Sequence, residues 1–109
     1  MDATHLVLLC ACPTAEVARE IATTLVDDGA AACVNIVPGL TSVYRWQGKT
    51  QADTELLLII KTTATAYRRA EETIQRLHPY ELPEIIAVPV VKGLGDYLHW
   101  MTLQTSADK

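Results

Sequence analysis

The chain alternates short apolar runs with stretches in which apolar side chains recur at helical spacing. Four short runs, rich in aliphatic residues on both faces, predict strands: HLVLLCAC (5–12), AACVNIV (31–37), TELLLIIKT (54–62) and EIIAVPVV (84–91). Helical spacing predicts one helix between Thr14 and Gly29 and a second from about Thr65 to His78, and a short third helix is expected from Asp96 in LGDYLHWMTLQ. The predicted order is β-α-β-β-α-β-α.

Local signals indicate where several of these elements begin, break or turn. Thr14 is a favourable N-cap for the first helix. Pro38 and Gly39 interrupt the second strand, which resumes as TSVYRW (41–46). The following QGKT (47–50) is typical of a turn, so the chain is expected to double back as a hairpin into the third strand.

This element order is that of a ferredoxin-like split β-α-β domain. The fold class is α+β, with a four-stranded antiparallel sheet in the order 4-1-3-2 and two helices on one face. The prolines agree with that order, because a proline cannot donate a ladder hydrogen bond and belongs on an edge strand or a bulge. Pro38 falls in the second strand and Pro89 in the fourth, and these strands form the two edges.

The predicted sheet has more apolar surface than two helices can cover. The third strand is apolar on both faces, with Leu57 and Ile59 alternating with Leu56, Leu58 and Ile60. Large exposed apolar patches are rare on monomeric proteins, so the uncovered face is expected to self-associate. The alternative is that the long hairpin folds back over its own sheet.

Composition restricts the function classes. The 109 residues form one expected domain, 1–109, and the net charge of −4 argues against partners that are nucleic acids or anionic membranes. No apolar stretch is long enough to span a bilayer, and the N-terminus lacks a basic signal-peptide start, so a cytoplasmic location is expected. The three cysteines contain no CxxC pair, and they predict reduced thiols rather than a disulfide framework.

Four motifs in order give the chain a family resemblance. AACVNIVPGLTSVYRWQGK, ELLLIIKT, HPYELPEI and GDYLHWM closely resemble the CutA family of divalent-cation tolerance proteins, from about His5 to Leu103. The resemblance implies a ferredoxin-like subunit in a compact homotrimer similar to the PII signalling proteins. It also implies an association with divalent metals, copper in particular, and brings no established enzymatic reaction.

The expected topology brings thiols and an imidazole together. The first strand and the second helix run toward the same end of the sheet, so Cys10 and Cys12 should lie near His78. Thiolate and imidazole are ligands preferred by copper and zinc. Cys10 and His78 are the first candidate metal ligands, which also match copper-linked positions of the resembled family, and Cys12 is a further candidate. The alternative is that Cys10 is a core residue and that His78 only ends the second helix.

A second set of residues matches recurrent positions of the resembled family and predicts a ligand-binding cleft between subunits of a trimer. Its members are Cys33, Tyr44, Trp46, Glu55, Lys61, Tyr80 and Glu84. A lysine, a glutamate and tyrosine hydroxyls would suit a small anionic or zwitterionic ligand. The alternative is that Lys61 pairs with Glu55 or Glu84 across an interface and fixes its register.

Three function classes follow from these observations. The first is a metal-responsive, copper-binding protein with no organic cofactor. The second is a PII-like sensor or scaffold that binds a small ligand. The third, an enzyme, is not expected, because the chain has no P-loop, no nucleophile elbow and no plausible catalytic triad.

Overall fold

A computed structural model describes residues 4–106 of the chain. Within this range the polypeptide forms four strands and three helices in the predicted order. They are β1 (His5–Cys12), α1 (Ala15–Asp27), β2 (Cys33–Trp46), β3 (Lys49–Thr63), α2 (Tyr67–Leu77), β4 (Ile86–Pro89) and α3 (Gly95–Gln104). None of the helices in the described range is long and apolar enough to cross a membrane.

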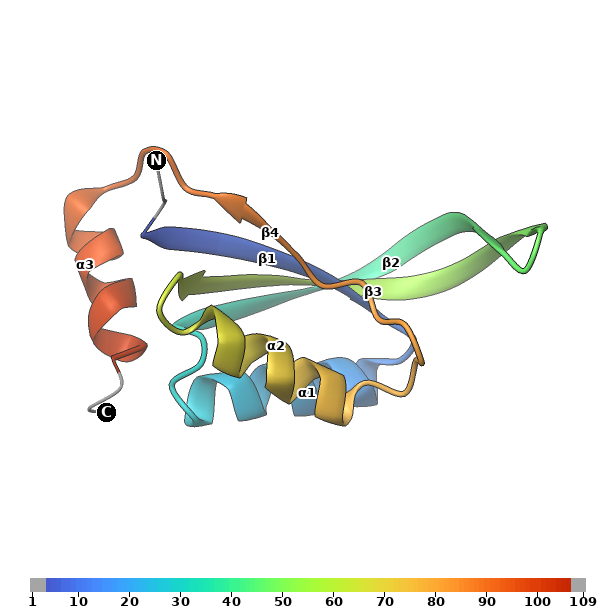
Figure 1. Ribbon diagram of the computed structural model, residues 1–109, viewed down its shortest axis with the longest axis horizontal. Helices are drawn as coiled ribbons and strands as arrows, with labels where there is room; N and C mark the ends of the chain where they lie inside the picture. Colours follow the sequence, from blue (N-terminus) through green and yellow to red (C-terminus); the bar gives the residue numbers. More distant parts are fainter. Residues whose placement is uncertain (1–3, 107–109) are drawn as a thin grey trace.

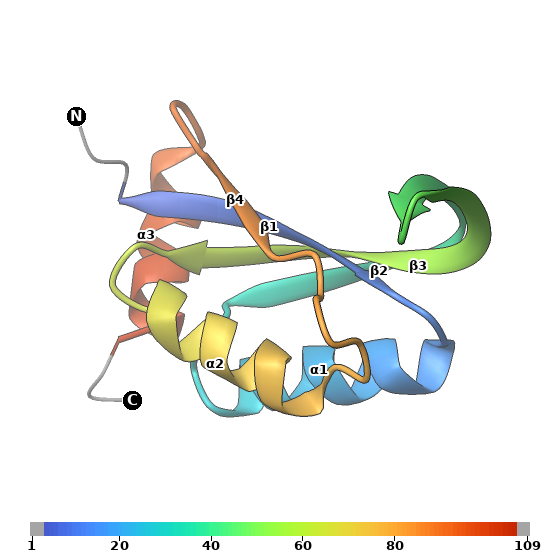
Figure 2. The same cartoon turned by 45° about the vertical axis from the view of Figure 1, so that its right-hand side comes forward.

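The strands form one antiparallel sheet in the order β2-β3-β1-β4, which confirms the predicted topology with β2 and β4 at its edges. Helices α1 and α2 lie side by side on one face of the sheet (Figures 1 and 2). Helix α3 stands at the end of the sheet where β1 begins (Figure 1). The His5 Nε2 atom lies 2.9 Å from both the Leu98 carbonyl oxygen and the Thr102 Oγ1, which ties α3 to β1.

The core lies between the sheet and the two covering helices. Leu8 on β1 and Leu58 and Ile60 on β3 are completely buried and share one sheet face. The predicted N-cap of α1 is confirmed, because the Thr14 hydroxyl accepts the Val17 backbone N–H at 3.2 Å. The apolar stripe of α1 faces the sheet, and the residues that it buries are Ala18, Ile21, Ala22 and Leu25.

The β2–β3 hairpin extends well beyond the two helices (Figure 1), and the described chain measures 44 × 27 × 22 Å. Pro38 and Gly39 do not end β2 but fall in a bulge between Val37 and Leu40. At the turn, Gln47 and Gly48 have φ angles of 51° and 80°, as in the two-residue turns that match strand twist. The hairpin does not fold back over the sheet, so the alternative of self-coverage is wrong for the described residues (Figures 1 and 2).

Strand β4 and helix α2 are shorter in the structure than the sequence pattern predicts. Strand β4 spans Ile86–Pro89 rather than 84–91, because Pro89 has no N–H and only the Val90 N–H continues to the His5 carbonyl, at 3.0 Å. Helix α2 begins at Tyr67 rather than Thr65, because residues 64–66 form a turn in which the Ala66 backbone N–H donates to the Thr63 hydroxyl at 3.4 Å.

The sheet face opposite α1 and α2, here called the open face, stays partly exposed. Directly paired residues share a face, so Val7 and Leu9 on β1 lie beside Val88 and Ile86 on β4. Val88 and Ile86 are 44% and 51% exposed. Ile59 lies opposite Leu9 on the other side, so the apolar surface is continuous across three strands.

Candidate metal centre and adjoining cleft

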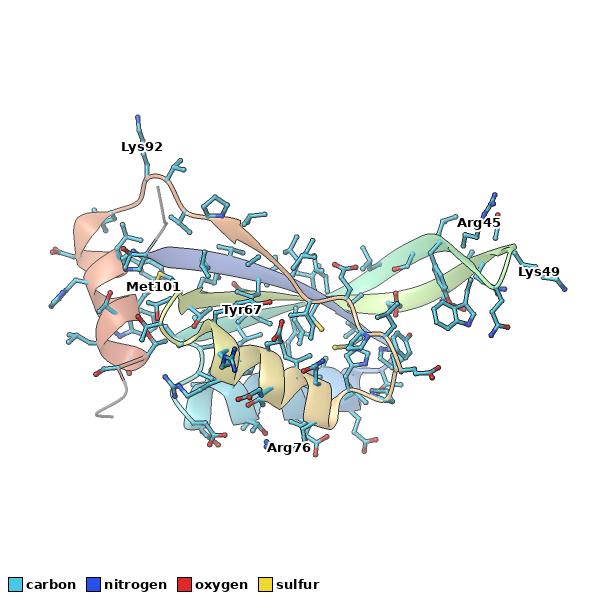
Figure 3. All side chains as sticks on the ribbon, viewed as in Figure 1. Arg45, Lys49, Tyr67, Arg76, Lys92 and Met101 are labelled. Carbon is cyan, nitrogen blue, oxygen red and sulfur yellow. The ribbon has the colours of Figure 1, made fainter. Side chains whose placement is uncertain are left out.

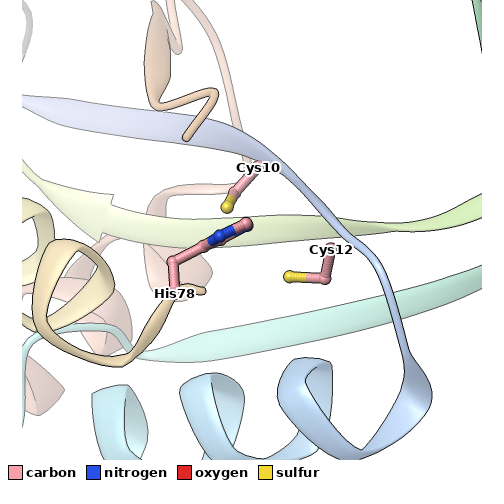
Figure 4. A group of neighbouring side chains, drawn as sticks. All are labelled: Cys10, Cys12 and His78. Carbon is pink, nitrogen blue, oxygen red and sulfur yellow. The ribbon is translucent and has the colours of Figure 1, made fainter. Parts of the chain in front are cut away.

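Two sulfurs and one imidazole meet between β1 and the end of α2. Cys10 and Cys12 are two residues apart on β1, and their side chains therefore point to the same, helix-covered face. His78 follows the last turn of α2, and its ring lies beside both sulfurs (Figure 4). One ligand atom from each of the three residues lies within 4.8 Å of the other two. The expectation that this topology brings Cys10, Cys12 and His78 together is confirmed.

All three side chains belong to the buried interior. Cys10 and Cys12 are fully buried and His78 is 6% exposed. Two thiols with one imidazole form a donor set that suits soft ions such as Cu(I), or Zn(II), better than Mg(II) or Ca(II). Burial also removes competing water, so the residues present fit a copper-type ion in chemistry and in spacing.

Both ring nitrogens of His78 already have partners. The Nε2–H donates to the Ala11 carbonyl at 2.8 Å, and Nδ1 accepts the Tyr80 backbone N–H at 3.2 Å. A carbonyl only accepts and a backbone N–H only donates, so these bonds select the tautomer with its proton on Nε2. The rings of His78 and Tyr80 also pack with centroids 4.6 Å apart. His78 can bind a metal only if its ring gives up one of these two hydrogen bonds.

The pKa values of the two thiols are shifted in opposite directions. A hydrogen bond to Cys12, followed by burial, raises the pKa of Cys10 far above its ordinary value. Cys12 accepts that hydrogen bond, which lowers its pKa although burial acts in the opposite direction. Proton loss is therefore easier at Cys12 than at Cys10, and a metal that binds both sulfurs must displace the Cys10 proton.

An open cleft of about 960 Å³ adjoins this centre. It lies between the outer part of the hairpin and the 79–86 segment that links α2 to β4. Ala11, whose carbonyl binds His78, also lines the cleft, so the two sites share a wall. The buried Glu55 accepts a hydrogen bond of 2.6 Å from the Tyr80 hydroxyl. Burial and this carboxylate raise the pKa of Tyr80.

The structure brings together five of the seven predicted cleft residues. Those that line the cleft are Tyr44, Trp46, Glu55, Tyr80 and Glu84. Cys33 and Lys61 lie at the opposite end of the open face, where the Lys61 ammonium donates to the Asn35 side chain and lies 3.9 Å from the Cys33 sulfur. Within one chain, Lys61 therefore does not reach Glu55.

Sequence reasoning missed two residues around these sites. Asp53 accepts a hydrogen bond from the Tyr44 hydroxyl, and this bond raises the pKa of Tyr44. The hairpin register would have suggested it, because Asp53 lies opposite Ser42, two residues from Tyr44 on the same face. Tyr97 on α3 lies near Cys33, and burial followed by that thiol raises its pKa. No local signal in the sequence indicates this second contact.

Comparisons with known proteins agree with the fold and the motifs. The family model described as CutA1 divalent ion tolerance protein matches residues 6–104. The divalent-cation tolerance protein CutA of Thermus thermophilus is 52% identical over 99 residues, which are 91% of this chain and 96% of that protein. Protein CutA of Mus musculus is 46% identical over 90 residues, and the match covers 83% of this chain and 51% of the mouse protein.

A solved structure extends the similarity to three dimensions. The divalent cation tolerance protein (Cut A1) from Thermus thermophilus superposes with a TM-score of 0.92 at 51% identity, covering 94% of this chain and 99% of that one. The sequence match and the superposition both cover most of the chain. This protein belongs to the CutA1 divalent ion tolerance family.

Proposed function

We propose that this protein binds copper at Cys10, Cys12 and His78 and that this binding underlies a role in metal tolerance. The observation that carries the proposal is the meeting of three buried donors within 4.8 Å, two of them sulfur. Copper is the favoured ion because soft thiolates select Cu(I) and copper leads the affinity order of divalent ions at nitrogen and sulfur sites. The proposed role is binding rather than catalysis.

The thiols are the principal ligands in this proposal. The Cys10 and Cys12 sulfurs already lie within 4.8 Å of one another, and the Cys10 thiol has only a long contact of 3.9 Å to the Ala11 carbonyl to give up. His78 must first release Ala11 or Tyr80. Loss of either thiol should therefore weaken copper binding more than loss of the imidazole.

The proposal includes a homotrimer in the cytoplasm. Support for self-association comes from the open face, where apolar side chains of β1, β3 and β4 are continuous and partly exposed. In a PII-like trimer these faces would pack together. The cleft of one chain would then approach the Cys33 and Lys61 end of another.

An anaerobic titration with Cu(I) against a competing chelator tests the metal site. The unaltered protein should withdraw about one ion per chain from the chelator, and Cys10→Ala and Cys12→Ala should each abolish this competition. Cys33→Ala removes the one thiol that lies outside the centre and should leave it unchanged. His78→Gln should weaken binding less than either thiol variant.

Circular dichroism and urea unfolding of each variant separate a lost ligand from a lost fold. Equal competition by the unaltered protein and a folded Cys10→Ala, Cys12→Ala double variant would mean that the cluster is only part of the core. Loss of binding with Cys33→Ala alone would move the metal site to the other end of the open face.

The adjoining cleft favours a second candidate function, a PII-like sensor or scaffold that binds a small ligand. Its support is a cavity of about 960 Å³ lined by predicted ligand-binding residues, with the buried Glu55 held by Tyr80. A site of this volume is large enough for a small metabolite.

A further inference from the structure

The segment of residues 79–85, which links α2 to β4, is held to the rest of the chain by few hydrogen bonds. It forms neither helix nor strand. Within residues 4–106, no backbone–backbone hydrogen bond involves it, and the two hydrogen bonds that it makes with side chains both come from Tyr80. The contacts of Tyr80 therefore largely determine where this segment lies.

Tyr80 connects the metal centre to the wall of the cleft. Its backbone N–H donates to Nδ1 of His78 at 3.2 Å, and its ring centroid lies 4.6 Å from that of the imidazole. Its hydroxyl donates at 2.6 Å to the buried carboxylate of Glu55 on β3. A hydrogen bond to a carboxylate is among the stronger kinds. We call these three contacts the Tyr80 latch.

The two ring nitrogens of His78 are not equally available to a metal ion. A metal ligand must offer a lone pair, but Nε2 carries the proton that it donates to the Ala11 carbonyl at 2.8 Å. Nδ1 has a lone pair, which accepts the Tyr80 N–H. Ligation through Nδ1 needs no proton transfer, and it preserves the bond from Nε2 to a backbone carbonyl, a partner that commonly orients a metal-bound histidine.

The two partners of His78 also differ in how firmly they are held. Ala11 belongs to β1 and pairs with Leu57 on β3. In the described range the pairing of β1 with β4 ends at Leu9, and beyond that point His78 takes the Ala11 carbonyl at the strand edge. Tyr80, by contrast, lies in the irregular segment. The partner that moves when His78 binds a metal is therefore expected to be Tyr80.

We propose that the Tyr80 latch regulates the metal centre, because His78 becomes a copper ligand through Nδ1 only when the latch opens. Opening means that the Tyr80 N–H leaves Nδ1 and that the tyrosine ring carries its hydroxyl away from Glu55. The inference rests on the proposed copper binding and adds its regulation. All latch contacts lie within one chain, so it requires no exposed surface on the cleft or the open face. Coupling is reciprocal, so a protein with a weaker latch must bind copper more tightly.

NMR spectra of the unaltered, isotope-labelled and reduced protein, recorded with and without Cu(I), test the latch directly. Cu(I) is diamagnetic, so the signals stay sharp. In long-range proton–nitrogen spectra of the His78 ring, the Nδ1 signal should shift when Cu(I) is added, while Nε2 keeps its proton. The backbone amide signal of Tyr80 should shift with it. The amide of Tyr67, in the first turn of α2 and far from His78, should not shift (Figure 3).

Matched variants measure the coupling. Tyr80→Phe keeps the ring beside His78 but removes the hydrogen bond to Glu55, and should tighten Cu(I) binding about fivefold in the chelator competition. In a His78→Gln background the same substitution should have no effect, because the latch then has no imidazole to release. Tyr67→Phe is the control, since the Tyr67 hydroxyl donates to the Glu71 carboxylate at 2.8 Å on α2. It should leave the copper affinity unchanged.

Several results would overturn the latch and leave copper binding intact. An unchanged His78 ring spectrum in the copper-loaded protein would mean that the thiols hold the ion alone. Loss of the Nε2 proton would make Ala11 the partner that is released. An unchanged or weaker affinity of Tyr80→Phe, or an equal gain in the His78→Gln background, would also contradict the coupling. Should Tyr80→Phe fail to fold, the ring spectra of the unaltered protein still decide. Failure of the unaltered protein to compete with the chelator would instead overturn the copper proposal itself.

Discussion

Cys10 and Cys12 occupy positions at which any small domain needs compact, apolar side chains. Their complete burial beside Leu8 and Leu58 is what a core cysteine would show. What separates them from ordinary core residues is the buried imidazole of His78, held beside both sulfurs by Ala11 and Tyr80. The core interpretation and the ligand interpretation describe the same geometry, and copper binding distinguishes them.

The raised pKa of Cys10 predicts how copper binding depends on pH. The pKa of Cys10 is raised, so this thiol is protonated in the metal-free protein and loses its proton when both sulfurs bind the ion. The affinity should therefore rise with pH, by about tenfold per unit for each thiol proton that is released. Competition titrations between about pH 6 and pH 8, corrected for the chelator's own protonation, measure this slope. A slope near zero would mean that Cys10 is not a ligand.

At the scale of elements, the β2–β3 hairpin decides where the cleft lies. The bulge at Pro38 and Gly39 bends β2, and the outer part of the hairpin carries Tyr44 and Trp46 to the cleft. The turn that closes the hairpin is imperfect, because Gln47 adopts a positive φ that asparagine and glycine tolerate better. Substitutions at Gln47 and at the adjacent Gly48 are therefore expected to change the stability of the hairpin.

Substitutions at this turn should change stability in opposite directions. Gln47→Asn should raise the free energy of unfolding by about 0.5 kcal/mol, because asparagine accepts the left-handed conformation at lower cost. Gly48→Ala should lower it by about 1 kcal/mol, since an added Cβ is strained at φ 80° although no atom crowds it. Urea unfolding measures both. Equal effects of the same sign would show that the turn conformation does not limit hairpin stability.

At the scale of the molecule, the open face is the main feature that a single chain leaves unexplained. Helices α1 and α2 cover one side of the sheet (Figure 2), while apolar side chains of β1, β3 and β4 stay accessible on the other. Burying three such faces together would add stability to a core that is modest for a small chain.

Light scattering tests this association. The proposed trimer should have a mass of about 36 kDa, three times the 12.0 kDa of one chain. Val88→Glu places a charge on the open face and should reduce the mass toward that of the monomer. Val26→Glu is a matched control on α1, because Val26 is 41% exposed and Val88 is 44% exposed. A monomeric mass for the unaltered protein at micromolar concentration would contradict self-association.

The sequence by itself determined the element order, the strand order and the shared face of Cys10 and Cys12. These features follow from local periodicity, from the exclusion of proline from central strands and from the alternation of side chains along a strand. Prediction was weaker at the ends of β4 and α2, where no strong cap or turn signal marks the boundary.

Only the tertiary structure decided the chemistry of the two sites. It showed that both His78 nitrogens have partners and that the buried Glu55 carboxylate accepts the Tyr80 hydroxyl. Such contacts depend on how far β2 and β3 bend and on where the 79–86 segment passes, and these are long-range consequences of twist and packing. Local patterns place residues on faces of elements, but the meeting of those faces is a property of the folded chain.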